Sequence, residues 1–312
     1  MKMLTVVSGG DAPGINAALG QIIQSASDGQ VLGCIGGLPG LVHGHWKRLQ
    51  REDVRPFVGL GGSLLASSRE PILKDPSAQA DARQKLHEAQ ITGIVLFGGD
   101  GTLRHVLPLL ISWGLPCAAI PTTIDNDVPG TDYTLGFDSA CNFAYHSIDG
   151  VTATAHALSG RVFMVETLGG STGYLALAVA AGAGAHAVLL PEYDYDELQV
   201  AVRLRAAADV DGFALLVFSE GAKGARTLAE TLPERVGMRV RDVRLGHAQR
   251  GGPPTHRDRV FARQAAELAV ETLAAGRSGV IVERGGVLQC VETLPNKRPL
   301  PDAALYRRIN GL

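Results

Sequence analysis

The chain has 312 residues, of which 46% are hydrophobic, a length that suits two compact domains and falls short of most three-domain enzymes. Its 29 basic and 31 acidic side chains give a net charge of -2, which argues against nucleic acid or an anionic membrane as a partner. The four cysteines lie far apart, with no CxxC pair and no histidine at metal-ligand spacing, so we expect a reduced, cytoplasmic protein.

The first apolar run, Met3–Val7, is stopped by Gly9 and is too short for a secretory signal or a membrane span. Similar short runs recur along the chain and alternate with helical patterns. The predicted strands are Met3–Val7, Gln30–Ile35, Gly93–Phe97, Cys117–Ile120, Val162–Val165, Ala187–Leu190 and Phe213–Phe218. The predicted helices are Ile15–Ala26, Ala78–Ala89, Thr102–Trp113, Ser139–Leu158, Gly173–Ala183, Asp196–Ala208 and Arg257–Ala275, with a short basic helix in the tail. This rhythm is typical of βα units and predicts an α/β fold with mostly parallel sheets.

Glycines directly follow two of the predicted strands, in VVSGGDAPGIN from Val6 and in VLFGGDGTLRH from Val95. Glycine at a strand end lets backbone N–H groups approach phosphate oxygens, and the next helix presents its positive end to them. Asp100 stands among these glycines before a helix that we expect Thr102 to cap, where a carboxylate suits Mg²⁺. The alternative is an aspartate in an ordinary turn. GGDGT also occurs in NAD kinases and lipid kinases, so it indicates phosphoryl transfer without naming the substrate.

A third strand end, after Cys117, is followed closely by Thr122, Thr123, Asp125 and Asp127. Phosphoryl transfer to an alcohol needs a carboxylate to accept the proton, while positioning and charge neutralisation supply most of the catalysis. Asp125 is the candidate base, and Asp127 would orient it or contact the metal. The alternative is an Asx-type turn network that closes a loop.

Four segments together resemble the phosphofructokinase family, and within it the bacterial ATP-dependent 6-phosphofructokinases. They are SGGDAPGIN at 8–16, GGDGT at 98–102, TIDND at 123–127 with GTDYT at 130–134, and LGHAQRGG at 245–252. The order and spacing fit over nearly the whole chain, and together the motifs argue against the NAD-kinase and lipid-kinase interpretations. The resemblance implies two Rossmann-like three-layer domains and transfer of the ATP γ-phosphoryl group to the 1-hydroxyl of fructose 6-phosphate. It also implies Mg²⁺ and a homo-oligomer, a tetramer or dimer, with sites shared between subunits.

The resemblance also assigns domains and ligand contacts. A larger nucleotide-binding domain would comprise 1–136 and 249–297, and a smaller sugar-phosphate-binding domain would comprise 137–248 and 298–312. The residues expected to line the nucleotide are Gly10, Arg69, Gly99, Asp100, Gly101 and Thr102, with Asp100 also serving the metal. The residues expected to bind the sugar phosphate are Thr123, Asp125, Asp127, Arg161, Leu168, Gly169, Gly170, Glu220, Arg241, His247 and Arg250.

Within these sets the resemblance gives some residues specific roles. Asp125 would be the base, supported by Thr123 and Asp127, and Arg69 would neutralise the transferring phosphoryl group. Arg161 and Arg241 would reach in from a neighbouring subunit, where guanidinium forks suit a phosphate dianion. Taken singly, Arg69, Arg161 and Arg241 are each better interpreted as solvated surface residues, and it is the joint pattern of motifs that reverses this interpretation.

The sequence departs from the family pattern at positions that bear on activity. Gly170 replaces the phosphate-binding arginine of a Met-Gly-Arg triplet. Thr122 stands where ATP enzymes have Gly and pyrophosphate enzymes have Lys, whereas Gly101 agrees with the ATP class. The alternatives are therefore a pyrophosphate-dependent kinase, a kinase for another phosphorylated sugar, or a weakly active regulatory paralogue.

Other departures from the family pattern concern the positions that flank the nucleotide and the effector site. Leu38 and Glu70 replace aromatic residues that usually flank the nucleotide. Charged family effector-site residues are replaced by Gly20, Gln24, Ala153, His186 and Asp211. A diphosphate effector would meet little positive charge there, so we expect ADP activation and phosphoenolpyruvate inhibition to be absent or weak.

Overall fold

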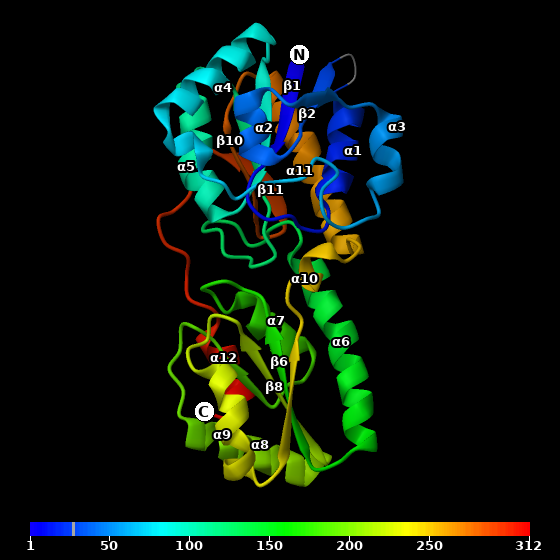
Figure 1. The fold of residues 1–312 in the computed structure, drawn as a ribbon, viewed down its shortest axis with the longest axis vertical. Coiled ribbons are helices and arrows are strands. Elements are labelled where there is room, and N and C mark those ends of the chain that lie inside the picture. The colour runs from blue at the N-terminus through cyan, green and yellow to red at the C-terminus, as the bar shows by residue number, and fades with distance from the viewer. Residues whose placement is uncertain (27–28) are drawn as a thin grey trace. The chain divides into compact units, whose positions relative to one another are not determined.

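The computed structural model describes residues 1–26 and 29–312. The chain divides into two compact units, each of them assembled from separate stretches of sequence (Figure 1). Unit 1 comprises Met1–Ser139 and Arg250–Arg298, and unit 2 comprises Ala140–Gln249 and Pro299–Leu312. No helix in the described part of the chain has the length and apolar character needed to cross a membrane.

Unit 1 contains a seven-stranded sheet in the order β11-β10-β5-β4-β1-β2-β3. Its strands are β1 (Lys2–Val7), β2 (Gln30–Cys34), β3 (Trp46–Arg48), β4 (Gly93–Gly98), β5 (Cys117–Pro121), β10 (Gly279–Arg284) and β11 (Val287–Val291). The inner strands are parallel, and the edge strands β3 and β11 pair antiparallel with their neighbours. From β1 the chain continues to β2 on one side and from β4 to β5 on the other, so the order reverses between β1 and β4. In open α/β sheets the ligand site lies outside the carboxyl ends of the strands at such a point.

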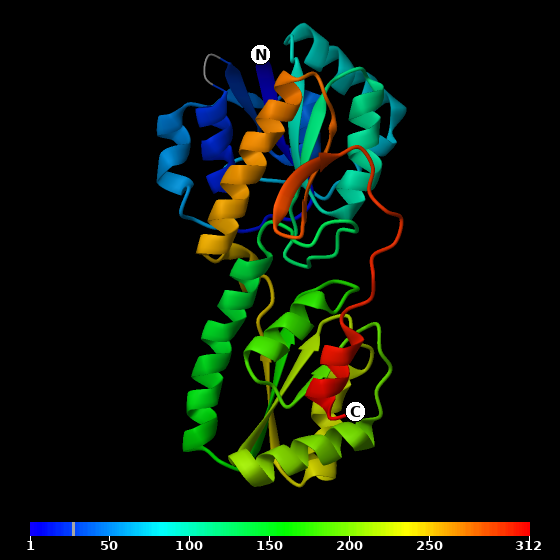
Figure 2. The ribbon, with the colours of Figure 1, turned by 180° about the vertical axis from the view of Figure 1, so that it is seen from behind.

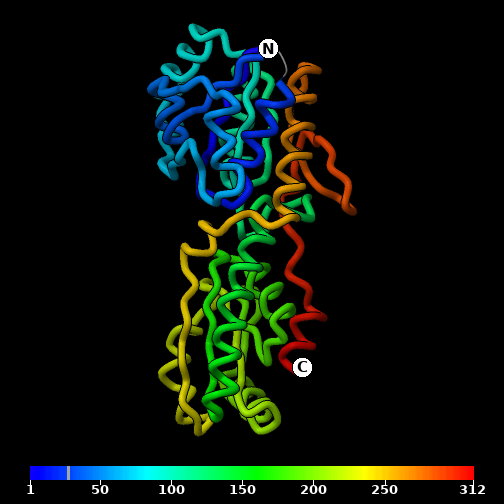
Figure 3. The backbone as a smooth tube through the Cα atoms, turned by 90° about the vertical axis from the view of Figure 1, so that its right-hand side faces the viewer, coloured from blue at the N-terminus to red at the C-terminus, as the bar shows by residue number. Residues whose placement is uncertain are grey.

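Helices cover both faces of this sheet. They are α1 (Ile15–Ser25), α2 (Gly37–His43), α3 (Arg51–Val54), α4 (Pro76–Glu88), α5 (Asp100–Ser112) and α11 (His256–Ala274), with 3₁₀ turns at Arg55–Phe57 and Ile72–Lys74. Helices α1 and α11 pack side by side although they are far apart in sequence, as the blue and orange segments of Figure 3 show. Alternate strand residues such as Leu4 and Leu96 form one core with Leu41 of α2, Leu86 of α4 and Leu107 of α5. The alternation follows from the two-residue period of a strand.

Unit 2 contains a four-stranded parallel sheet in the order β7-β8-β6-β9 (Figure 2). Its strands are β6 (Arg161–Thr167), β7 (Ala187–Leu189), β8 (Phe213–Ser219) and β9 (Arg239–Arg244). Its helices are α7 (Tyr174–Gly182), α8 (Glu197–Asp211), α9 (Ala225–Val236) and α12 (Ala303–Asn310), together with α6 (Phe137–Ala157) from Ala140 onward. The short helix α10 (Ala248–Gly251) lies at the boundary between the units in the sequence. Met164 and Leu216 form a core with Leu204 of α8 and Leu228 of α9.

The α/β class with mostly parallel sheets is confirmed, and each predicted strand and helix is present within a few residues of its expected bounds. The sequence interpretation missed strands β3, β9, β10 and β11 and helices α2, α3, α9 and α10. The expected cap at Thr102 is wrong, because α5 begins at Asp100 with Gly99 as its N-cap residue. Thr102 is the third residue of α5, and its hydroxyl lies 3.0 Å from the Ser8 hydroxyl.

Candidate active site

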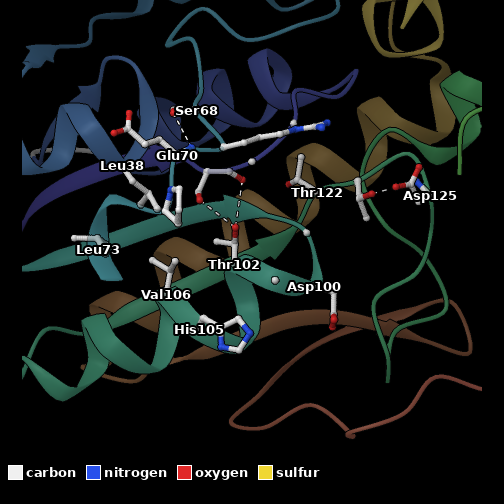
Figure 4. Close-up of a pocket in the computed structure, with 18 of the residues that line it drawn as sticks. Leu38, Ser68, Glu70, Leu73, Asp100, Thr102, His105, Val106, Thr122 and Asp125 are labelled. Carbon is white, nitrogen blue, oxygen red and sulfur yellow. Dashed lines mark hydrogen bonds between the residues drawn. The ribbon is translucent and has the colours of Figure 1, made fainter. Parts of the chain in front are cut away.

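A pocket with a volume of about 540 Å³ lies in unit 1 at the carboxyl ends of β1, β4 and β5 (Figure 4). All the unit 1 residues expected to bind ligand line it. They are Gly10, Arg69, Gly99, Asp100, Gly101, Thr102, Thr123, Asp125, Asp127 and Arg250. Folding therefore brings these residues from separate stretches of the sequence around one space.

The glycine loops form the wall of the pocket between β1 and β4. Gly9 has φ 98°, a left-handed conformation that favours glycine, and its N–H donates to the Ser68 carbonyl at 3.0 Å. The Ser8 N–H donates to the Phe97 carbonyl at 2.8 Å, which ties the end of β1 to β4. A Cβ at Gly101, on the first turn of α5, would meet no atom of the described residues within 4 Å outside its own helix turn. The start of α5 is thus open to a ligand, and a helix N-terminus favours an anion there.

Two arginine side chains converge over Gly10. A Cβ built at Gly10 would lie 1.8 Å from Nη1 of Arg250 and 3.2 Å from Nη2 of Arg69. The Arg250 Nε is buried and has no hydrogen-bond acceptor among residues 1–26 and 29–312. Like charges held this close repel each other, and a buried donor without a partner is unfavourable. A phosphate group would relieve both penalties.

Asp125 stands at the end of the pocket away from Leu38 and Leu73 (Figure 4). Its backbone N–H donates to Oγ1 of Thr123 at 3.2 Å, and the Thr123 carbonyl accepts from Thr134 Oγ1 at 2.7 Å. The next residue, Asn126, is held in a left-handed conformation at φ 50°. These bonds form a turn built on a threonine hydroxyl, the Ser/Thr counterpart of the Asx-type turn considered above, and they hold the backbone of the loop that carries Asp125.

Asp100 and Asp127 supply the carboxylates for a cation. Burial raises the pKa of the Asp127 carboxyl above its usual range; the positive charge of Arg298 opposes this, and the negative charge of Asp100 adds to it. Among the described residues, no cluster of three or more His, Cys, Asp or Glu could hold a metal. Mg²⁺ commonly binds one or two carboxylates and takes its other ligands from phosphate and water, so these residues fit that ion when a nucleotide is present.

Asp100 already has a partner that was not expected. Nε of Arg104 lies 2.7 Å from Oδ1 and 2.8 Å from Oδ2 of Asp100. Nη2 of Arg104 donates to the carbonyl oxygens of Pro295 and Asn296 at 3.3 and 3.1 Å. The spacing of four residues on one helix is the sequence signal that predicts such a pair.

The opposite end of the pocket is largely aliphatic. Leu38, Leu73 and Val106 line it together with the polar side chains of Glu70 and His105 (Figure 4). A flat ring there would lie against leucine and valine methyl groups. Lys74 and His105 also line the pocket, and the sequence interpretation did not name them.

Thr122 takes up little of the pocket although it replaces a family glycine. Its hydroxyl donates back to the Ile120 carbonyl at 2.9 Å, and the residue is 2% exposed. The extra side chain is therefore directed mostly into the protein.

In unit 2 a second group of predicted residues gathers at the carboxyl ends of adjacent strands. Leu168–Gly170 follow β6, Glu220 follows β8, and His247 follows β9. The Gly170 N–H donates to Glu220 Oε1 at 3.0 Å. Gly170 has φ 59°, a conformation that glycine adopts freely and arginine does not.

Two other unit 2 residues do not join this group. Arg161 begins β6, seven positions before Leu168, which corresponds to roughly 20 Å along an extended strand. Arg241 lies within β9, opposite Phe163 in the register. Within unit 2, both arginines are separated from the carboxyl edge of the sheet.

Another arginine near this group was missed. Nε and Nη2 of Arg226, on the first turn of α9, lie 2.7 and 2.9 Å from the two carboxylate oxygens of Glu166. The carboxylates of Glu166 and, more weakly, Glu220 raise the pKa of Arg226. Arg226 therefore adds a cation at the end of β6, the strand that Leu168–Gly170 follow.

The residues that replace charged family effector-site residues lie in both units, and their surroundings differ. In unit 2, Nε2 of His186 lies 3.0 Å from Oδ2 of Asp211, and its Nδ1 accepts from the Leu215 N–H. In unit 1, Gly20 and Gln24 line a pocket of about 250 Å³. Four arginines share this pocket: Arg51, Arg55, Arg259 and Arg263. The expectation of little positive charge is therefore wrong for the unit 1 positions.

Comparison with known proteins agrees with this geometry. Residues 2–273 match the family model described as phosphofructokinase. The chain is 41% identical over 283 residues to the ATP-dependent 6-phosphofructokinase of Lysinibacillus sphaericus, covering 89% of this chain and 88% of that protein. Phosphofructokinase from Saccharomyces cerevisiae superposes with a TM-score of 0.87 at 25% identity, covering 93% of this chain and 44% of the yeast chain. A pyrophosphate-dependent phosphofructokinase from Marinobacter aquaeolei shares the fold, with a TM-score of 0.83 at 21% identity over 96% of this chain and 85% of that one. This chain belongs to the phosphofructokinase family.

Proposed function

We propose that the protein transfers the γ-phosphoryl group of ATP to the 1-hydroxyl of fructose 6-phosphate, with Asp125 as the general base. The observation that carries the proposal is the convergence of Arg69 and Arg250 over Gly10, in a pocket that also contains Asp125 and Asp100. Two guanidinium groups, open helix amides and carboxylates around one space are what a polyphosphate, a cation and a reacting alcohol require. The relative from Lysinibacillus sphaericus, named ATP-dependent 6-phosphofructokinase, supports the same choice of substrates.

Each group then has a defined task. Asp125 accepts the proton of the attacking hydroxyl, and the bond from its backbone N–H to Thr123 Oγ1 holds the backbone of its loop. Arg69 and Arg250 neutralise the negative charge on the phosphoryl oxygens while the phosphoryl group is transferred. Asp100, with Asp127, would hold Mg²⁺, which when bound draws negative charge from the phosphate oxygens.

We assign the nucleotide to unit 1 and the sugar phosphate to the carboxyl edge of the unit 2 sheet. Glu220 would accept hydrogen bonds from sugar hydroxyls, and His247 would donate to the phosphate. Arg161 and Arg241 would act in a neighbouring copy of the chain. Their distance from Leu168–Gly170 within unit 2 supports a homo-oligomer with shared sites.

ATP is the proposed donor because, among residues 1–26 and 29–312, no atom outside the same helix turn lies within 4 Å of a Cβ built at Gly101, and because the Thr122 hydroxyl is turned back to the Ile120 carbonyl. The α-phosphate therefore has room. The aliphatic end of the pocket supplies a surface for a base, which pyrophosphate lacks. We place this reaction in the cytoplasm, at the glycolytic step that the family serves.

The test is to incubate the purified protein with fructose 6-phosphate, ATP and Mg²⁺ and to identify the product by ³¹P NMR. We expect a second phosphomonoester on carbon 1. Asp125→Ser should reduce turnover by about a hundredfold or more, the usual contribution of a general base, while the dissociation constants of both substrates change little. Wild-type turnover by this variant would show that another group removes the proton.

A further inference from the structure

We propose that Arg104 competes with the metal ion for the Asp100 carboxylate and thereby sets the metal affinity of the site. The inference rests on the proposed function, because it concerns the Mg²⁺ that accompanies the nucleotide. It assigns Arg104 a positioning role and not a contact with the reacting atoms.

The contacts of Arg104 hold its guanidinium on two sides. Nε is within 2.8 Å of both Asp100 oxygens, and Nη2 donates to the Pro295 and Asn296 carbonyls. The exposed fractions of the Arg104 and Asp100 side chains are 26% and 32%, so neither moves freely in solvent. Because the pair lies one turn apart on α5, helix geometry alone brings the side chains together.

The consequence follows from the chemistry of the carboxylate. Both Asp100 oxygens face the guanidinium nitrogen, and Mg²⁺ or a water on Mg²⁺ binds the same oxygens. A guanidinium and a divalent cation also repel each other at this range. The ion pair must therefore loosen before Asp100 can serve the metal, and metal loading should also loosen the contact of α5 with Pro295 and Asn296.

An ordinary helix-surface ion pair is the competing interpretation. Such pairs contribute little to stability, and the chain contains another, between Arg205 and Asp209 on α8. Arg205 likewise donates to a backbone carbonyl, that of Val236, at 3.1 Å. It lies in unit 2 and lines none of the pocket described above. Arg205→Gln is therefore a matched control.

The experiment titrates Mn²⁺ into the full-length protein with a nonhydrolysable ATP analogue and follows free Mn²⁺ by electron paramagnetic resonance. Arg104→Gln should bind Mn²⁺ about threefold to fivefold more tightly, the range expected for releasing a partly exposed ion pair. Arg104→Lys should fall between Arg104→Gln and wild type, because the charge remains but the fork is lost. Arg205→Gln should match wild type, and the Mg²⁺ concentration for half-maximal turnover should shift as Mn²⁺ affinity does.

Unchanged or weaker Mn²⁺ binding by folded Arg104→Gln would overturn the proposal. If Arg104→Gln does not fold, Arg104→Lys takes its place, and unchanged or weaker Mn²⁺ binding by that variant would overturn the proposal too. In an Asp100→Asn background, Arg104→Gln should have no further effect, and an equal gain there would also count against competition at Asp100. The proposed function is tested separately by Asp100→Asn alone. If that variant binds Mn²⁺ as wild type does, the metal site itself has been misplaced.

Discussion

Replacing Gly10 with alanine should separate catalysis from folding. The new Cβ would stand 1.8 Å from Nη1 of Arg250, whereas carbon and its neighbours pack at about 3.5 Å, so the guanidinium must move by roughly 1.5–2 Å. Gly10 does not have a left-handed φ, so alanine is compatible with its backbone. The atoms in the way are the far end of a flexible side chain, which can swing aside at little expense to the fold.

The activity should suffer because the displaced group is the one expected to meet phosphate. Loss of one charge-assisted hydrogen bond costs about 1.5–3 kcal/mol, which corresponds to roughly 10- to 150-fold in kcat/KM. The free energy of unfolding should change by less than about 1 kcal/mol.

The assay is a coupled measurement of turnover over a range of ATP and sugar phosphate, together with urea unfolding. Gly150→Ala, in α6, is the control, since a Cβ there would have no atom from the rest of the described chain within 4 Å, apart from the backbone of its own helix. It should leave kcat/KM unchanged. Arg250→Gln should lose about as much activity as Gly10→Ala, and the double variant should lose little more. Wild-type kcat/KM for Gly10→Ala would refute a phosphate-binding role for the arginines over Gly10.

Two further predictions follow from other parts of the chain. Burial raises the pKa of Cys34 and Cys117 to about 12, so both thiols should resist alkylation at pH 8 until the protein is unfolded. Because the native state keeps these protons longer than the unfolded state, stability should fall as pH rises from 9 towards 12; rapid alkylation of native protein or flat stability over this range would contradict the reasoning. His186 and Asp211, two of the positions expected to have lost charged effector-site residues, pair with each other, so we expect ADP to leave the fructose 6-phosphate saturation curve unchanged in shape. A sigmoidal-to-hyperbolic shift with ADP would show that the arginines around Gly20 and Gln24 suffice for an effector.

The sequence predicted the elements whose apolar pattern is strong and missed those whose pattern is weak. Strands such as β4 and β8 are buried along their whole length and read as continuous apolar runs. Strand β9 has the sequence RVRDVR and lies at the edge of its sheet with its four charged residues exposed, so it lacks the apolar run or strict alternation that predicts a strand. The hairpin of β10 and β11 turns through Gly285 and Gly286, and a Gly-Gly pair between two short apolar runs is a sequence signal for such a hairpin.

For the candidate site, the motifs identified the residues but not their partners. Arg69 and Arg250 are far apart in sequence, and only the folded chain brings them over Gly10. The pairing of Arg226 with Glu166 likewise forms only when folding brings the first turn of α9 to the end of β6. The Asp100–Arg104 pair was within reach of the sequence, because four residues on a helix place two side chains on one face.

The choice of phosphoryl donor tests the central claim most directly. Purified protein should be assayed with fructose 6-phosphate and Mg²⁺, in parallel with ATP and with pyrophosphate. We predict turnover with ATP and none above background with pyrophosphate, because Gly101 leaves room for the α-phosphate and the aliphatic end of the pocket suits a base. Turnover with pyrophosphate alone would contradict the assignment of the donor, and turnover with neither would contradict fructose 6-phosphate kinase activity.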